Sequence, residues 1–285
     1  IVGDLPIYVP LDSADVWSAP EEFLLDETRR PRCVAGVPPD YFSADGQLWG
    51  NPIYDWAYMK QTGYSWWMRR MRSACTLFDC VRIDHFRGLS SYWSVAADAE
   101  TARSGEWIQG PGGDFVNLLK ETFPSFEIIA EDLGFLTDEV RTLLKESGFP
   151  GMKVLQFAFD AREPSNYLPH TYDNHCVCYA GTHDNTTVAG WFTEANPDDV
   201  AFAVRYLGLN EREGYVWGIL RGGMGSVADL FLAQIQDYIG LDSQGRMNIP
   251  GTLGGNNWRW RLLPGELTDD LVAKIGELTV LYGRA

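Results

Sequence analysis

Apolar and polar residues follow one another along this chain in short runs that predict strands separated by helices. Apolar, often β-branched runs predict six strands, at 4–9, 78–84, 127–131, 152–158, 175–181 and within 228–238. Helical spacing of apolar residues predicts helices at 62–76, 115–122, 137–147, 197–207, 211–220 and 267–282. Apolar strands that alternate with helices indicate an α/β fold with a parallel sheet.

Two long stretches lack a clear period. Residues 10–58 contain a run of turn residues and aromatics at 36–52, which we expect to be a functional loop because it is too aromatic for disorder. Residues 88–113 are expected to be irregular with helical pieces. The apolar run at 226–239 fits either a helix leading into a strand or the reverse order.

Three of the predicted strands end in charged side chains. The strand at 78–84 ends with Arg82 and Asp84, which lie on the same side because side chains alternate along a strand. The other two strands end at Glu131 and at Asp184. In a barrel of parallel strands, the carboxyl ends form the active-site face. Six strands also suit an open doubly wound sheet, but such a sheet gives no reason to collect charged groups from three strands around one pocket, so we favour a barrel.

The three carboxylates have the chemistry needed to cleave a glycosidic bond. Such cleavage requires one ionised carboxylate that attacks or activates water, and one protonated carboxyl that releases the leaving oxygen. Arg82 favours an ionised Asp84, whereas Glu131 leaves an apolar strand and faces two other anions, which raises its pKa toward that of an acid. Asp184 can stabilise positive charge or bind sugar hydroxyls, and His183 can donate a hydrogen bond there.

Each of these features also has a structural interpretation. The Arg82 and Asp84 pair can be a structural salt bridge, and Glu131 can begin an exposed loop. Residues 182–185 can cap a helix that begins near Thr186, since Asp and Asn are good N-caps. The occurrence of all three at strand ends in one chain favours the catalytic interpretation.

Charge and composition narrow the class of ligand. The 285 residues carry a formal net charge of −16, which argues against nucleic acid or an anionic membrane as a partner and fits a neutral or cationic ligand. No apolar run approaches a membrane span, and the first residues predict a strand and not a signal peptide. The chain has 11 Trp residues, and several aromatics lie in Gly/Pro/Asn-rich stretches, where they can offer flat faces to a sugar.

The 5 cysteines show no spacing typical of a zinc site. The cysteine spacing therefore predicts no zinc site, and we expect Cys176 and Cys178 to be buried thiols in a reducing compartment. This favours the cytoplasm, while a plastid stays open because the native N-terminus is not in view.

The segments around the three carboxylates resemble the catalytic motifs of the α-amylase clan. They read Val-Arg-Ile-Asp-His-Phe-Arg-Gly at 81–88, Ile-Ala-Glu-Asp-Leu-Gly at 129–134 and Gly-Thr-His-Asp-Asn at 181–185. The loop at 36–52, together with Asn-Ile-Pro-Gly-Thr at 248–252 and Asn-Asn-Trp-Arg-Trp-Arg at 256–261, resembles one branch of that clan. This branch is the amylomaltases or disproportionating enzymes (4-α-glucanotransferases, glycoside hydrolase family 77), and the similarity runs over residues 1–285.

The resemblance implies a TIM (β/α)8 barrel and a retaining mechanism that acts on α-1,4-glucans and malto-oligosaccharides without metal or cofactor. Asp84 would be the nucleophile, Glu131 the acid/base and Asp184 the stabiliser of the transition state. Transfer in place of hydrolysis would follow if the loop excludes water while the 4-hydroxyl of a second glucan attacks. The substrate-binding residues that the resemblance implies are Arg82, His85, His183, Asp40, Gln47, Trp49, Phe157 and Asn257.

The first predicted strand resembles the third strand of the family barrel. The resemblance therefore implies a single catalytic domain at 1–285 that spans about strand 3 to strand 8, with insertions at about 10–60 and 186–225. A barrel without its first two strands would expose two sheet edges. The leading function is an α-1,4-glucan transferase, and the alternatives are a glucan hydrolase of the same clan or a non-catalytic glucan-binding fragment.

Overall fold

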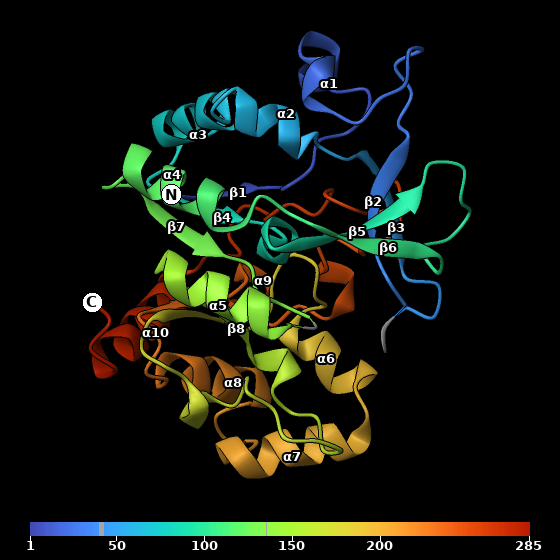
Figure 1. Ribbon diagram of the computed structural model, residues 1–285. Coiled ribbons are helices and arrows are strands. Elements are labelled where there is room, and N and C mark those ends of the chain that lie inside the picture. The colour runs from blue at the N-terminus through green and yellow to red at the C-terminus, as the bar shows by residue number, and fades with distance from the viewer. Residues whose placement is uncertain (40–42, 135) are drawn as a thin grey trace. The chain divides into compact units, whose positions relative to one another are not determined.

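The computed structural model describes residues 1–39, 43–134 and 136–285, coloured along the chain in Figure 1. They form two compact units, Ile1–Gly151 and Met152–Ala285. Each unit contains short parallel strands and several helices, so the α/β class predicted from the sequence is confirmed. Every helix in these described ranges is too short or too polar to cross a bilayer.

A three-stranded parallel sheet forms the centre of the first unit. It consists of β1 (Val2–Leu5), β4 (Cys80–Ile83) and β7 (Glu127–Ala130) in the order β1-β4-β7. All three are shorter than predicted, and the first ends at Leu5 instead of running to residue 9. Helices α3 (Ser65–Leu77) and α4 (Gly112–Thr122) precede β4 and β7. The other helical segments of the unit are α1 (Ala14–Ser18), η1 (Pro20–Glu22), α2 (Trp56–Gln61), η2 (Phe86–Leu89) and α5 (Asp138–Ser147).

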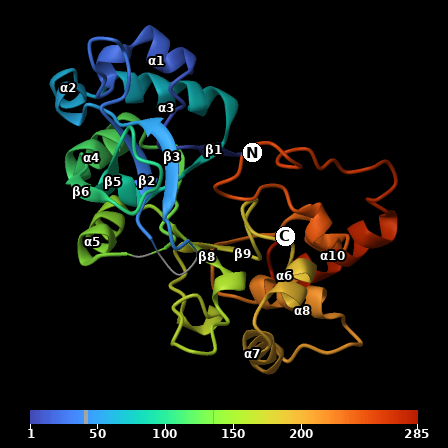
Figure 2. The same cartoon turned by 90° about the vertical axis from the view of Figure 1, so that its right-hand side faces the viewer.

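The first unit also contains a four-stranded antiparallel sheet that the sequence analysis missed. Its strands are β2 (Cys33–Val37), β3 (Gln47–Pro52), β5 (Ser91–Ala96) and β6 (Gly105–Gln109), in the order β3-β2-β5-β6. The prediction of irregular structure at 36–52 and 88–113 was therefore wrong at these four strands, which lie side by side in Figure 2. Glycine and proline in β2 and β3 hide the alternation of apolar and polar positions there. Strands β5 and β6 have only 6 and 5 residues, which leaves little period to detect.

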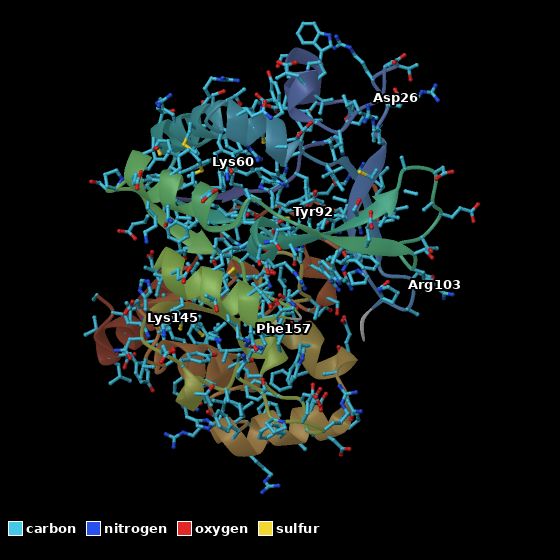
Figure 3. The ribbon with its side chains drawn as sticks, in the orientation of Figure 1. Asp26, Lys60, Tyr92, Arg103, Lys145 and Phe157 are labelled. Atoms are coloured by element: carbon cyan, nitrogen blue, oxygen red, sulfur yellow. The ribbon has the colours of Figure 1, made fainter. Side chains whose placement is uncertain are left out.

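Two details show how this sheet is held. A Cβ on Gly36 would lie 2.4 Å from the carbonyl oxygen of Gln47, so a glycine there permits close approach of the two backbones. Arg103, labelled in Figure 3, lies in the β5–β6 turn and pairs with Asp45 in the β2–β3 connection at 2.5 Å. The two hairpin turns are thus linked by charge as well as by the strands between them.

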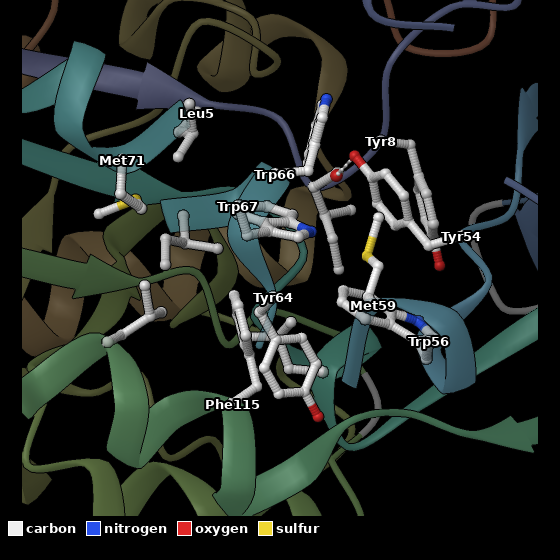
Figure 4. Close-up of a cluster of buried hydrophobic side chains, with 14 of the residues drawn as sticks. Leu5, Tyr8, Tyr54, Trp56, Met59, Tyr64, Trp66, Trp67, Met71 and Phe115 are labelled. Carbon is white, nitrogen blue, oxygen red and sulfur yellow. Dashed lines mark hydrogen bonds between the residues drawn. The ribbon is translucent and has the colours of Figure 1, made fainter. Parts of the chain in front are cut away.

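Aromatic side chains fill the core between the helices of the first unit (Figure 4). Trp67 on α3 is completely buried, and its ring stacks on Trp56 at 6.3 Å and meets Phe115 edge-on at 5.3 Å. The hydroxyl of Tyr54 donates a hydrogen bond to the carbonyl oxygen of Ile7 at 2.7 Å. Part of the high Trp content therefore serves packing, since aromatic pairs stabilise beyond the apolar area they bury.

The second unit is built on β8 (Gly151–Val154), β9 (Cys176–Tyr179) and β10 (Leu230–Leu232), in the order β10-β9-β8. Strands β9 and β10 pair in parallel. Figures 1 and 2 show the helices around these strands. They are α6 (Val188–Glu194), α7 (Pro197–Leu207), α8 (Tyr215–Met224), α9 (Ile235–Tyr238) and α10 (Asp269–Leu281), and the 3-10 segments are η3 (Leu155–Phe157), η4 (Pro169–Thr171) and η5 (Ser243–Gly245).

Three boundaries in this unit differ from the prediction. The strand expected at 152–158 ends at Val154 and continues as the 3-10 segment η3. The helix expected at 211–220 begins only at Tyr215, because Asn210 accepts the amide hydrogen of Glu213 in a turn ahead of it. The apolar run at 226–239 is a strand followed by a short helix, which settles the order that the sequence left open.

The five cysteines are free thiols. Cys176 and Cys178 are buried on β9, as predicted, and burial raises the pKa of Cys178 to about 12. The Cys178 thiol is thus kept in the neutral, unreactive form.

Candidate active site

The carboxyl ends of β1 and β4 form an ion-pair network around Arg82. Strand register places Asp4 opposite Arg82, and the guanidinium donates from Nη1 to Asp4 at 2.5 Å and from Nη2 to Asp84 at 2.8 Å. Burial lowers the pKa of Arg82, but Asp84, Asp4 and Glu131 together raise it above its usual value. The cation is therefore permanent, while the Asp84 side chain stays 38% exposed and accessible to a ligand.

Glu131 follows β7 and is buried, with 9% of its surface exposed. Its two oxygens accept backbone amide hydrogens, Oε1 from Leu133 and Oε2 from His85, both at 2.7 Å. Burial and the nearby charge of Asp84 raise the pKa of Glu131 to about 7, although Arg82 and the two amides act in the opposite direction. The exposed-loop interpretation of Glu131 is therefore wrong, and the carboxyl can hold or release a proton near neutral pH.

His85 connects this carboxyl to the aromatic loop. Its backbone is left-handed, with φ 53°, and this directs its amide toward Glu131. Its ring meets Trp49 edge-on at 4.8 Å, and Trp49 in turn donates from Nε1 to Gln47 at 3.2 Å. Burial, with a smaller effect of Arg87, lowers the pKa of His85 to about 3, so the imidazole is neutral. Within the first unit, the structure thus brings together His85, Gln47 and Trp49 beside Glu131.

Asp184 lies on the connection from β9 to α6 in the second unit. Its Oδ1 accepts a hydrogen bond from the side-chain amide of Asn248 at 2.6 Å and lies 3.6 Å from Nε2 of His183. The ring of His183 packs on Trp258 with centroids 5.1 Å apart. The Asp184 side chain is 38% exposed, so it too can reach a ligand.

The helix-cap interpretation of residues 182–185 is wrong. Helix α6 begins at Val188, and its N-cap is Thr187, whose hydroxyl accepts the amide hydrogen of Gly190 at 3.0 Å. Asn185 instead accepts the amide hydrogen of Thr182 at 2.9 Å and closes the turn that contains Asp184. The carboxylate is therefore not needed to begin the helix.

The other expected sugar-binding residues lie in different settings. Asn257 bridges its own loop, because it accepts from the amide of Ile249 at 3.1 Å and donates to the Thr252 hydroxyl at 2.9 Å. Phe157 belongs to η3 and is labelled in Figure 3; its ring meets Tyr167 edge-on at 5.9 Å. Asp40 lies outside the described residues.

Two contacts of the carboxylates were missed from the sequence. In the sequence, Asp4 lies at the start of a predicted strand, and no local pattern signals its pairing opposite Arg82. Asn248 was noted only as part of a motif, and its contact with Asp184 joins residues 64 positions apart. Among the described residues, His, Cys, Asp and Glu side chains form no group of three suited to a metal ion.

The paired carboxylates, with one permanently paired to a cation and the other titrating near pH 7, have the electrostatics of glycosidic-bond chemistry. A family model described as 4-alpha-glucanotransferase, glycoside hydrolase family 77, matches residues 1–267. The chain belongs to this family. The 4-alpha-glucanotransferase of Clostridium butyricum is 50% identical over 286 residues, and that of a Synechocystis strain is 51% identical over 287 residues.

A solved structure agrees with this family membership. The chain superposes on an amylomaltase from Streptococcus agalactiae, solved in complex with acarbose, with a TM-score of 0.96 and 41% identity. All of the chain is covered in these comparisons, but it spans only 58% of the Clostridium glucanotransferase, 57% of the Synechocystis one and 58% of the Streptococcus amylomaltase. The family is thus established for a chain a little over half as long as these relatives.

Proposed function

We propose that this protein is a 4-α-glucanotransferase that moves α-1,4-glucan segments between malto-oligosaccharides by a retaining double displacement. Asp84 is the nucleophile, Glu131 the acid/base and Asp184 the stabiliser of the transition state. Family membership and the acarbose bound to the Streptococcus amylomaltase support a malto-oligosaccharide substrate. The other sugar-binding residues proposed are Arg82, His85, His183, Asp40, Gln47, Trp49, Phe157 and Asn257.

The observation that carries this proposal is the opposite electrostatic setting of Asp84 and Glu131. Asp84 is paired with a permanent cation, which favours the ionised nucleophile. Glu131 is buried and has a pKa of about 7, which favours a proton on the carboxyl at neutral pH. A double displacement needs this difference, because one group must attack as an anion while the other delivers a proton.

The reaction then proceeds in two balanced steps. Asp84 attacks the anomeric carbon while Glu131 gives its proton to the departing glycosidic oxygen, which leaves a glycosyl ester on Asp84 and an ionised Glu131. In the second step, the ionised Glu131 takes the proton of an acceptor 4-hydroxyl as that oxygen attacks the anomeric carbon, and the Asp84 carboxylate leaves. Amide hydrogen bonds from His85 and Leu133 hold both oxygens of Glu131 for these transfers.

We also propose that the strands of the two units belong to one (β/α)8 barrel domain, of which this chain contributes about strand 3 to strand 8. Parallel pairing within β1-β4-β7 and between β9 and β10, together with the amylomaltase superposition, supports this assignment. The free, buried thiols on β9 support a reducing compartment, which we propose to be the cytoplasm or a plastid.

The experiment that tests the function is incubation with maltotriose, with products separated by length. We expect glucose together with maltopentaose and longer chains, and an Asp84→Asn variant slower by about 10⁴-fold or more. Asp138→Asn, an exposed change on α5, is the matched control and should leave the rate unchanged. Glucose and maltose without longer chains would identify a hydrolase, and maltotriose binding without turnover would identify a binding fragment; either result contradicts the proposal.

A further inference from the structure

The backbone of the Asp184 loop is held by a residue from a distant part of the sequence. Arg246, which follows η5, donates from Nη2 to the carbonyl oxygen of Asp184 at 2.6 Å. The same guanidinium donates from Nε to the carbonyl oxygen of Asn248 at 2.8 Å. Arg246 therefore binds the peptide of Asp184 and the peptide of the residue whose side chain donates to the Asp184 carboxylate.

A further hydrogen bond joins the same two segments, and another joins the segment of Arg246 and Asn248 to Trp258. The amide of Asn248 donates to the carbonyl oxygen of His183 at 3.0 Å, and the amide of Trp258 donates to that of Met247 at 2.7 Å. Together with the Asn248 side chain, these bonds fix both the backbone and the carboxylate of the loop. A planar guanidinium suits this position, because its donors have a fixed geometry that a flexible lysine lacks.

The segment that contains Arg246 is itself anchored in the second unit. Gln236, which is buried, donates from Nε2 to the carbonyl oxygen of Gly245 at 3.1 Å. Ser243 bonds to Glu194, and Thr186 donates to the same Glu194 oxygen at 3.3 Å. The backbone that carries Arg246 is thus held in place, so its guanidinium can hold the peptide of Asp184 in place.

We propose that Arg246 is a positioning residue that sets the location of Asp184 by fixing its peptide carbonyl and the backbone of Asn248. The role of Asp184 in the reaction rests on the proposed function, whereas the backbone link does not. Removal of the guanidinium is expected to leave Asp184 intact but displaced. Because Asp184 acts on the transition state in the proposed mechanism, the loss falls on kcat more than on KM.

Hydrogen exchange tests the link without relying on activity. Wild type, Arg246→Ala, Arg246→Lys and the control Arg205→Ala, an exposed change on α7, are compared by peptide mass spectrometry. We expect amide exchange in peptides covering 182–188 and 247–258 to become about tenfold faster in Arg246→Ala, and other peptides to be unchanged. Equal exchange in wild type and Arg246→Ala, or faster exchange in every peptide, would overturn the proposal.

Activity then tests the consequence for the reaction. On maltotriose, Arg246→Ala should lower kcat by about 10²-fold with KM changed less than about threefold, and added guanidinium should restore part of kcat. The kcat of Arg246→Lys should lie between those of wild type and Arg246→Ala. An ammonium lacks the fixed planar geometry with which the guanidinium donates to the carbonyl oxygens of both Asp184 and Asn248. Faster local exchange in Arg246→Ala with an undiminished kcat would reject the positioning role. An inactive Asp84→Asn with a fully active Asp184→Asn would instead reject the role of Asp184, while the exchange result on the link would stand.

Discussion

The carboxylates of the two units are held by cations in opposite ways. In the first unit, Arg82 binds the carboxylates of Asp84 and Asp4 directly, and its charge lowers the pKa of Glu131. In the second unit, Arg246 binds the peptide carbonyl of Asp184 and leaves the carboxylate to a neutral amide. From this difference we expect the guanidinium of Arg82 to tune reactivity and that of Arg246 to fix position.

The largest expected changes in reaction rate distinguish the role of Asp84 from that of Glu131 in the first unit. With α-maltosyl fluoride as donor, Glu131→Gln should still release one fluoride per enzyme in a burst, because fluoride departs without a proton. On maltotriose, the same variant should be slower than wild type by about 10²- to 10⁴-fold, since the proton must come from Glu131. Asp84→Asn, by contrast, should lose both the fluoride burst and the activity on maltotriose. A Glu131→Gln enzyme that is as fast as wild type on maltotriose would mean that Glu131 is not the acid.

The next effect tests whether Arg82 sets reactivity. Activity should fall as pH rises through about 7, because the proton of Glu131 is lost there. Arg82→Gln should lower kcat/KM by about 10²- to 10³-fold, since it leaves Asp84 and Asp4 without their shared cation. The basic limb of the pH profile should also move to higher pH, because Arg82 lowers the pKa of Glu131. A profile with an unmoved basic limb would show that Arg82 acts only through structure.

A smaller effect in the first unit is the pH dependence of the free energy of unfolding, which depends on Glu131. The pKa of Glu131 is raised to about 7 from an ordinary 4.5, so the folded chain binds more protons than the unfolded chain in this range. The stability it contributes is therefore full below about pH 4.5 and is lost as pH rises through 7. Between pH 5 and pH 8, wild type should lose about 2 to 3 kcal/mol more than Glu131→Gln in urea unfolding. Parallel pH dependences of the two proteins would contradict this.

The smallest expected effect is the pH dependence of the free energy of unfolding in the second unit, which depends on Asp237. Asp237 on α9 is buried, its Oδ1 accepts the amide hydrogen of Val188 at 2.7 Å, and burial raises its pKa to about 6. Its contribution to stability has the same sign and is lost as pH rises through about 6. From pH 4.5 to pH 7, Asp237→Asn should lose about 2 kcal/mol less than wild type, measured by urea unfolding. The exposed Asp242→Asn should follow wild type, and equal curves for all three would refute the prediction.

Sequence reasoning found the candidate site because strand ends carry a local signal. Apolar runs that stop at Asp84, Glu131 and near Asp184 are visible without knowledge of the fold. The long-range contacts of the site were invisible, because Asp4 meets Arg82 across 78 positions and Arg246 meets Asp184 across 62 positions of sequence. Such contacts depend on strand register and loop path, which no local period encodes.

The fold was predictable to a similar extent. Helix α7 has the predicted bounds because Pro197 begins it and Gly208, in a left-handed conformation, follows its end. The antiparallel sheet was missed, because its strands are short and their pairing depends on the register between separate segments. The strand after Gly151 was extended too far, since the apolar residues of η3 continue its pattern into a tighter helix.

The sharing of one arginine by two aspartates has a consequence for inhibitor selectivity. The two carboxylates of Asp4 and Asp84 share the single positive charge of Arg82, so the group has a net charge of about −1. An ionised Glu131 adds one more negative charge. A sugar mimic with a protonated nitrogen at the anomeric position should therefore bind more tightly as pH rises through about 7, as long as it stays protonated. An uncharged mimic of the same shape should not gain affinity in this way, so the pH dependence of the affinity ratio reports the local charge.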